Sequence, residues 1–171
     1  ITLLKAEANN EKSTQYLEEM EKEIKSYEAQ NKTGNKVLDA VLTSKSLYCQ
    51  NKGIGFTCVA DGTLLDFMAE MDISALFGNI LDNAIESTEK IREKEKRLIH
   101  LSVSQQKKFL RIRIENYCEE KIVFKKGIPQ TTKKDKRFHG FGMKSIQSTV
   151  KKYGGSVTAG VRDNWFELRI L

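Results

Sequence analysis

The 171-residue sequence predicts an α+β protein, a two-layer α/β sandwich preceded by a helical hairpin or stalk. Three patterns lead to this prediction. An apolar heptad pattern lies within the first thirty residues, two longer helical patterns with an apolar side follow, and the second half contains segments that alternate polar and apolar residues. A sheet with one apolar face must be covered by helices, and this gives two layers.

The heptad pattern consists of Leu17, Met20, Ile24 and Tyr27, which recur at spacings of three or four residues. On a helix they form one apolar stripe. Such a stripe fits a helical hairpin that dimerises into a bundle. It also fits a single amphipathic helix that packs on the core of its own domain, and the sequence leaves both possibilities open. Residues 1–8 are expected to be the end of a preceding helix.

The middle of the chain is expected to alternate helices and strands. Asn35 is a good N-cap, and Gly53 can end the same helix in a left-handed conformation. The elements expected next are a strand over 55–60, an apolar segment over 64–68 that could form a short strand, and a long helix capped by Asp72 that ends near Glu93.

Two strands, a loop, a helix and two further strands complete the expected order. Ile112 and Ile114 alternate with Arg111 and Arg113, which predicts a sheet with one buried face. The expected ranges are strands at 98–104 and 109–115, a basic loop, a helix at 140–153, and strands at 156–161 and 165–171.

The composition excludes several classes of protein. With 39% hydrophobic and 30% charged residues, the chain is neither disordered nor fibrous. No apolar run approaches the roughly 20 residues of a membrane span. The three cysteines form no Cys-x-x-Cys pair, so we expect buried or half-buried free thiols rather than disulfides or a zinc site. The first residue is not methionine, so we expect a fragment of a longer protein.

The net charge of +6 is unevenly distributed. Residues 1–31 carry seven acidic and four basic residues, whereas residues 101–171 carry sixteen basic and six acidic residues. The densest basic stretch, Lys121 to Arg137, could attract nucleic acid, an acidic membrane surface or a phosphorylated small molecule, or could be a solvated loop. It has no helical period of the kind that nucleic-acid binders present, so we expect no nucleic-acid partner.

The first motif that suggests chemistry is Asn79-Ile80-Leu81-Asp82-Asn83-Ala84-Ile85-Glu86. On a helix, Asn79, Asn83 and Glu86 fall on one face beside the apolar side. Amide and carboxylate oxygens suit a hard divalent ion such as Mg²⁺, which also binds phosphates. An exposed polar stripe without a ligand is the alternative.

The second motif is Phe138-His139-Gly140-Phe141-Gly142-Met143-Lys144. Glycines at the start of a helix leave backbone N–H groups open to an anion such as phosphate, although a flexible helix start is the commoner meaning of such a pattern. The third motif is the strand end Ile114-Glu115-Asn116, where a polar side chain could bind a ligand that lies over the sheet.

Together these motifs resemble the ATP-binding domain shared by gyrase, Hsp90, histidine kinases and MutL, known as the GHKL or Bergerat fold. The resemblance covers about residues 35–171 and includes Gly154-Gly155 and Phe166-Glu167-Leu168. The sequence more closely resembles quorum-sensing histidine kinases of the Agr/VirS type. This resemblance implies a histidine-kinase-like ATPase fold that holds ATP between the Asn-rich helix and a lid at about 117–139.

The resemblance also implies roles for individual residues. Asn83 would ligate Mg²⁺, and Asn79 would contact the phosphates or share the ion. Asn116 stands where most relatives have an Asp that binds the adenine amino group, and an amide oxygen can accept the same hydrogen bond. The glycines that usually follow that Asp are absent here, as in the Agr type. The implied ATP-binding residues are Asn79, Asn83, Glu86, Asn116, Lys136, Arg137, His139, Gly140, Phe141, Gly142 and Met143.

The resemblance finally implies the reaction. Gyrase-like ATPases have a Glu at the place of Asn79 as a base, and an amide cannot take a proton, so phosphoryl transfer to a histidine is expected rather than ATP hydrolysis. That histidine is expected before Ile1, which makes residues 1–33 a truncated dimerisation hairpin and residues 34–171 the catalytic domain.

The resemblance places the chain in two-component signalling. A response regulator and a second copy of the chain, joined through the hairpin, would be its partners. Its location would be cytoplasmic, within a protein anchored in the cell membrane. The alternative, motivated by the missing glycines after Asn116, is a degenerate nucleotide-binding or interaction module without kinase activity.

Overall fold

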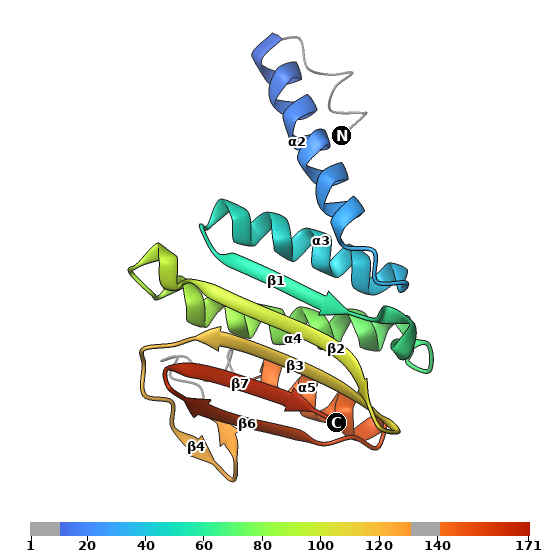
Figure 1. Ribbon diagram of the computed structural model, residues 1–171, viewed down its shortest axis with the longest axis vertical. Coiled ribbons are helices and arrows are strands. Elements are labelled where there is room, and N and C mark those ends of the chain that lie inside the picture. The colour runs from blue at the N-terminus through green and yellow to red at the C-terminus, as the bar shows by residue number, and fades with distance from the viewer. Residues whose placement is uncertain (1–10, 131–140) are drawn as a thin grey trace.

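A computed structural model describes residues 11–130 and 141–171. Its main element is a five-stranded mixed sheet with helices on one side (Figure 1). The helices are α2 (Glu11–Gln30), α3 (Lys36–Asn51), η1 (Gly62–Leu65), α4 (Glu70–Glu89), η2 (Lys94–Lys96) and α5 (Phe141–Lys152), of which η1 and η2 are short 3₁₀ helices. The strands are β1 (Gly55–Ala60), β2 (Leu98–Gln106), β3 (Phe109–Tyr117), β4 (Phe124–Lys125), β5 (Ile128–Pro129), β6 (Val157–Arg162) and β7 (Trp165–Ile170).

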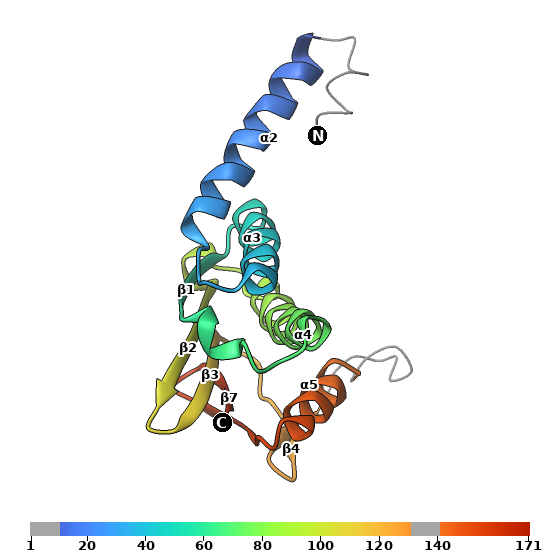
Figure 2. The same cartoon turned by 90° about the vertical axis from the view of Figure 1, so that its right-hand side faces the viewer.

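The sheet has the strand order β1-β2-β3-β7-β6. Strands β1 and β2 are parallel, with Gly55 opposite Leu98, and the remaining pairs are antiparallel. Helices α3, α4 and α5 cover one face of the sheet, while α2 extends away from it (Figure 2). The predicted two-layer α/β sandwich preceded by a helical segment is therefore confirmed.

The core lies between these two layers because each element contributes one apolar face to it. Leu38, Phe77 and Ile146 are completely buried, and they come from α3, α4 and α5 respectively. In β3 the predicted alternation holds, since Ile112 and Ile114 are buried. The strands add the following buried side chains: Ile99, Leu101, Val103, Ile112, Ile114, Leu168 and Ile170.

Helix α2 contacts the rest of the domain at its C-terminal end, where the Asn31 side chain donates a hydrogen bond to Ser46 Oγ. Along the helix, the apolar stripe is only partly covered: Met20 is 37% exposed, and Leu17 and Ile24 are half-buried. The interpretation of this segment as a helix packed along the core of its own domain is therefore wrong (Figures 1 and 2).

Local capping signals predicted both ends of α3. The Asn35 side chain accepts a hydrogen bond from Leu38 N at 3.0 Å, as an N-cap does. Gly53 adopts a positive φ of 65°, so it ends α3 in the left-handed conformation expected of glycine.

Three other boundaries differ from the prediction. The segment 64–68 forms no strand: its first two residues belong to the 3₁₀ helix η1 and the other three form a turn. Asp61 caps η1 by accepting a hydrogen bond from Thr63 N. Helix α4 begins at Glu70 and ends at Glu89, and Asp72 lies in its first turn instead of capping it. The basic loop contains a short hairpin formed by β4 and β5.

Asp72 does not cap α4 because its carboxylate binds the end of α5. It accepts hydrogen bonds of 2.6 Å from both Lys152 Nζ and Tyr153 Oη. The Tyr153 hydroxyl also accepts a hydrogen bond from Ala69 N, which satisfies a backbone donor at the start of α4. This clasp of Asp72, Lys152 and Tyr153 fixes the end of α5 to the start of α4.

The clasp predicts a pH dependence of stability. The hydrogen bonds from Lys152 and Tyr153 lower the pKa of Asp72 below its ordinary value. A lowered carboxyl pKa stabilises the fold above the pKa of the unfolded chain, and this stabilisation is lost as the pH falls through the folded pKa. In urea unfolding, Asp72→Asn should therefore destabilise at pH 7 but match the wild type in acid. Asp66→Asn, at an exposed site before α4, is the control. If Asp72→Asn lost the same unfolding free energy at every pH, the clasp would be refuted.

Candidate functional site

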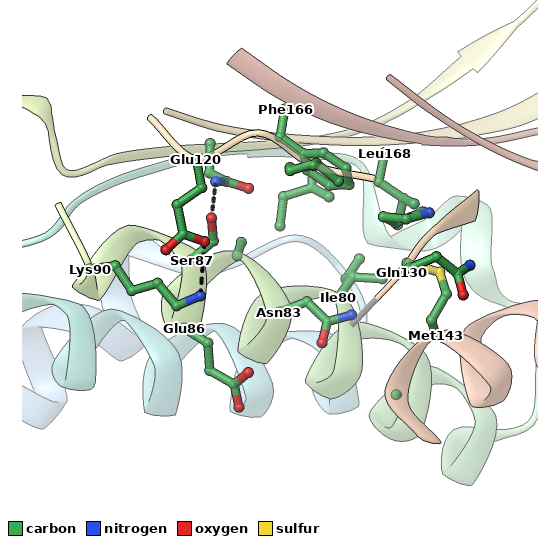
Figure 3. A pocket seen from close by; sticks show the side chains of 16 residues that line it. Ile80, Asn83, Glu86, Ser87, Lys90, Glu120, Gln130, Met143, Phe166 and Leu168 are labelled. Carbon is green, nitrogen blue, oxygen red and sulfur yellow. Dashed lines mark hydrogen bonds and ion pairs between the residues drawn. The ribbon is translucent and has the colours of Figure 1, made fainter. Parts of the chain in front are cut away.

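A cavity of about 190 Å³ lies between α4, the start of α5 and the inner face of the sheet (Figure 3). This volume is below the roughly 300–1,000 Å³ of pockets that enclose a drug-sized ligand, so the cavity has room for a group of about the size of a planar ring. The apolar walls are Ile80, Ala84, Ile114, Ile122, Pro129, Met143, Phe166 and Leu168. The polar lining residues are Asn83, Glu86, Ser87, Lys90, Asn116, Glu120 and Gln130.

Gly142, at one end of this cavity, faces the two asparagines of α4. A β-carbon at Gly142 would lie 3.3 Å from Asn83 Oδ1 and 3.7 Å from Asn79 Oδ1. The absence of a side chain therefore leaves both amide oxygens open to the same small space. The Asn79 Nδ2 group donates to Ser145 Oγ at 3.1 Å, which holds α5 beside α4. Two amide oxygens facing open space form a partial ligand set for Mg²⁺, which keeps several waters and binds phosphates.

Asn116 lies at the other end of the cavity, near the end of β3. Its side chain is only 1% exposed. The Nδ2 group donates to the Tyr117 carbonyl oxygen at 3.1 Å and to Ser87 Oγ at 3.2 Å. A buried amide needs such partners because an unpaired polar group in the interior is costly. Ser87 is one helical turn after Asn83, so α4 contributes to both ends of the cavity.

Lys90 and Glu120 form an ion pair of 3.1 Å beside Ser87 (Figure 3). Glu120 belongs to the segment that replaces the expected glycines. In the same segment Cys118 is buried, and its backbone N–H donates to Asn164 O. Burial raises the pKa of the Cys118 thiol. The segment is therefore held by a buried side chain and by ion pairs at its surface.

The structure brings together most of the predicted site residues that it describes. Asn79, Asn83 and Gly142 meet at one end of the cavity, and Met143 and Asn116 line it. Glu86 also lies at its edge, but the side chain is exposed and points away from the cavity (Figure 3). Phe141 begins α5. The predicted residues Lys136, Arg137, His139 and Gly140 lie outside the described residues.

Several lining residues were not predicted. Ser87 and Lys90 continue the spacing of Asn79 and Asn83 along α4, so the helical period could have indicated them. Phe166 and Leu168 alternate along β7, but their contact with this cavity depends on the pairing of β7 with β3. His100 lies in β2 as expected, where its ring stacks on Trp165 at a centroid distance of 5.3 Å.

Comparison with known proteins identifies the family. Residues 68–171 match the GHKL domain family, and the chain belongs to it. No curated protein matches the chain. None of the helices in the described ranges is long and apolar enough to cross a membrane.

Solved structures of histidine kinases share the fold. The nucleotide-free catalytic domain of histidine kinase ThkA is 17% identical, with a TM-score of 0.61 over 81% of this chain and 92% of that chain. Acinetobacter baumannii histidine kinase AdeS is 12% identical, with a TM-score of 0.53 over 93% of this chain and 77% of that chain. Full-length ShkA in complex with AMPPNP is 16% identical, with a TM-score of 0.53 over 78% of this chain and 28% of that chain.

The orientation of Asn116 predicts the effect of a carboxylate at this position. Asn116→Asp would replace an amide donor by an oxygen that faces the Tyr117 carbonyl, and two acceptors cannot bond each other. We expect a loss of unfolding free energy on the order of 2–3 kcal/mol at pH 7. The loss should shrink in acid, where a protonated carboxyl can donate. Urea unfolding at pH 7 and in acid measures the loss at each pH. Asn164→Asp, in the exposed β6–β7 turn, is the control. If Asn116→Asp were as stable as the wild type, this amide orientation would be wrong.

Proposed function

We propose that this chain is the ATP-binding catalytic region of a sensor histidine kinase and that it binds Mg²⁺·ATP in the cavity along α4. The observation that carries the proposal is the position of Gly142 directly over the amide oxygens of Asn79 and Asn83, at one end of an apolar cavity that Asn116 lines at the other. Membership of the GHKL domain family supports it.

In this proposal the base and the phosphates occupy opposite ends of the site. The base lies among Ile80, Ile114 and Phe166, with Asn116 Oδ1 accepting a hydrogen bond from its amino group. From Asn79 to Ser87, α4 rises about 12 Å at 1.5 Å per residue, which separates the two ends. Backbone N–H groups at the start of α5, with Gly142, face the phosphates. Lys136, Arg137, His139 and Gly140, which lie outside the described residues, are proposed as ATP-binding residues on the family resemblance alone.

Asn83 and Asn79 would hold Mg²⁺ through their amide oxygens. An ion held by these oxygens would supply positive charge that offsets the charge of the phosphates. The protein contributes mainly positioning, because phosphoryl transfer depends on alignment and charge stabilisation. Asn79 donates a hydrogen bond to Ser145, which positions α5 beside α4. Its amide is not basic, so it cannot take a proton from water.

The proposed reaction transfers the γ-phosphoryl group to the imidazole nitrogen of a histidine outside these 171 residues. The bond from the γ-phosphorus to the bridging oxygen breaks, a phosphorus–nitrogen bond forms, and ADP leaves. His100 is unsuited to this role because it stacks on Trp165 and does not line the cavity. A response regulator would then receive the phosphoryl group.

We further propose the domain organisation that this function requires. Residues 1–33 belong to a dimerisation hairpin, supported by the partly exposed apolar stripe of α2, and residues 34–171 form the catalytic domain. The full protein would be membrane-anchored with this region in the cytoplasm. The Agr/VirS quorum-sensing type is proposed because the glycines that usually follow the adenine-binding position are absent, with Cys118 and Glu120 in their places.

The same segment favours one alternative, a module that binds nucleotide or a partner without kinase activity. Glu120 pairs with Lys90 at the end of α4, and Glu119 lies 3.9 Å from Lys96 in η2. Ion pairs therefore hold this segment where relatives have glycines. Phosphoryl transfer to a supplied histidine-bearing helical hairpin distinguishes the two functions.

Equilibrium binding of Mg²⁺·ATP tests the proposal. We expect Asn83→Ala to weaken binding about tenfold or more with Mg²⁺ and little without it, because the lost oxygen contacts the ion. Gly142→Ala should weaken binding as well, since its methyl group would occupy the space before Asn79 and Asn83.

Gly78→Ala is the matched control for Gly142→Ala. A β-carbon at Gly78 meets no atom within 4 Å, so this variant should bind ATP like the wild type. It should also be more stable by about 0.5–1 kcal/mol, because alanine is the better helix former. Absence of binding to the wild type at millimolar ATP would refute the proposed function.

A further inference from the structure

The inner end of the cavity holds a hydrogen-bonded pair, Asn116 and Ser87, whose orientation is determined by its surroundings. Asn116 is 1% exposed and uses both hydrogens of Nδ2, one for the Tyr117 carbonyl oxygen and one for Ser87 Oγ. A carbonyl oxygen can only accept, so the amide nitrogen must face Tyr117, and the flipped amide would place two acceptors together.

This orientation leaves two polar groups available to a ligand. Within the described part of the chain, Asn116 Oδ1 accepts no hydrogen bond. The Ser87 hydroxyl accepts from Asn116 and so retains its own hydrogen for donation. Both residues line the cavity. The cavity therefore presents one acceptor and one donor side by side at its inner end.

We propose that Ser87 is a specificity-determining residue, which together with Asn116 forms hydrogen bonds to the base of the nucleotide. The 6-amino group of adenine would donate to Asn116 Oδ1, and ring nitrogen N1 would accept from the Ser87 hydroxyl. Guanine and hypoxanthine carry a carbonyl oxygen at position 6 and an N–H at position 1, which is the reverse pattern. The pair thus matches adenine and opposes these two bases.

The apolar surroundings make this discrimination strong. Ile80, Ile114 and Phe166 line the same space, so a mismatched polar edge there would lose its water without gaining a partner. Sites built on buried hydrogen-bonding groups reject mismatched ligands far more strongly than apolar pockets reject a size difference. This inference rests on the proposed function and deepens it by naming the residue that selects the base.

Binding of three nucleotides to the full 171-residue chain with Mg²⁺ tests the inference. The nucleotides are ATP, inosine triphosphate, which has the reversed edge, and purine riboside triphosphate, which retains N1 but lacks the 6-amino group. We expect the wild type to bind ATP roughly 100-fold more tightly than inosine triphosphate. Ser87→Ala should weaken binding of ATP and of purine riboside triphosphate by the same factor, about 2- to 10-fold, because both retain the N1 contact.

Ser104→Ala, at an exposed position of β2, is the matched control and should bind like the wild type. Equal wild-type affinity for ATP and inosine triphosphate, or unchanged ATP affinity in Ser87→Ala, would overturn the inference and leave the proposed function standing. Absence of binding of all three nucleotides to the wild type would overturn both. The wild-type comparison needs no variant, so misfolding of Ser87→Ala would not remove the test.

Discussion

The packing of α4 against the sheet is the constraint on which the site depends. One side of this helix, including Phe77, Ile80 and Leu81, is buried in the core. The period of 3.6 residues then places Asn79, Asn83 and Ser87 in a row at the edge of that buried side. They are close enough to the core to be held in place and close enough to the surface to meet a ligand. A rotation of α4 would remove both the core contacts and the site, so stability and binding select the same orientation.

Helix α5 has to be held in register with α4 for this row to be useful, and it is held at two places. The clasp of Asp72, Lys152 and Tyr153 fixes its C-terminal end, and the hydrogen bond from Asn79 to Ser145 fixes it nearer its start. Gly142 consequently lies over the asparagine oxygens, although α4 and α5 are far apart in the sequence. The hydrogen-bonded residues Asn79 and Ser145 are sixty-six positions apart. The open space over Asn79 and Asn83 is a product of this helix pairing and of the missing side chain at Gly142.

The sequence predicted those features that depend on neighbouring residues. Asn35 and Gly53 mark the two ends of α3 through local capping. The alternation in β3 identified the buried face of that strand. The start of α4 was predicted wrongly because Asp72, a good cap by residue type, binds Tyr153 eighty-one residues away. In the site, the spacing of Asn79 and Asn83 predicted two amides on one face of α4, and it indicated a nucleotide site only together with the glycine motif and the strand end at Asn116. Ser87 continues the same helical spacing, but its hydrogen bond with Asn116 depends on the packing of β3 against α4 and could not be predicted from the spacing.

The central claim is that a nucleotide lies along α4 with its base at Asn116 and its phosphates at Asn79, Asn83 and Gly142. Nuclear magnetic resonance of the side-chain amides tests this most directly, because each end of the site carries its own asparagine signals. During titration with Mg²⁺·ATP, the side-chain signals of Asn79, Asn83 and Asn116 should shift together with a single dissociation constant, whereas the signal of Asn164 should not move. Shifts at only one end, or none at millimolar ATP, would contradict this placement.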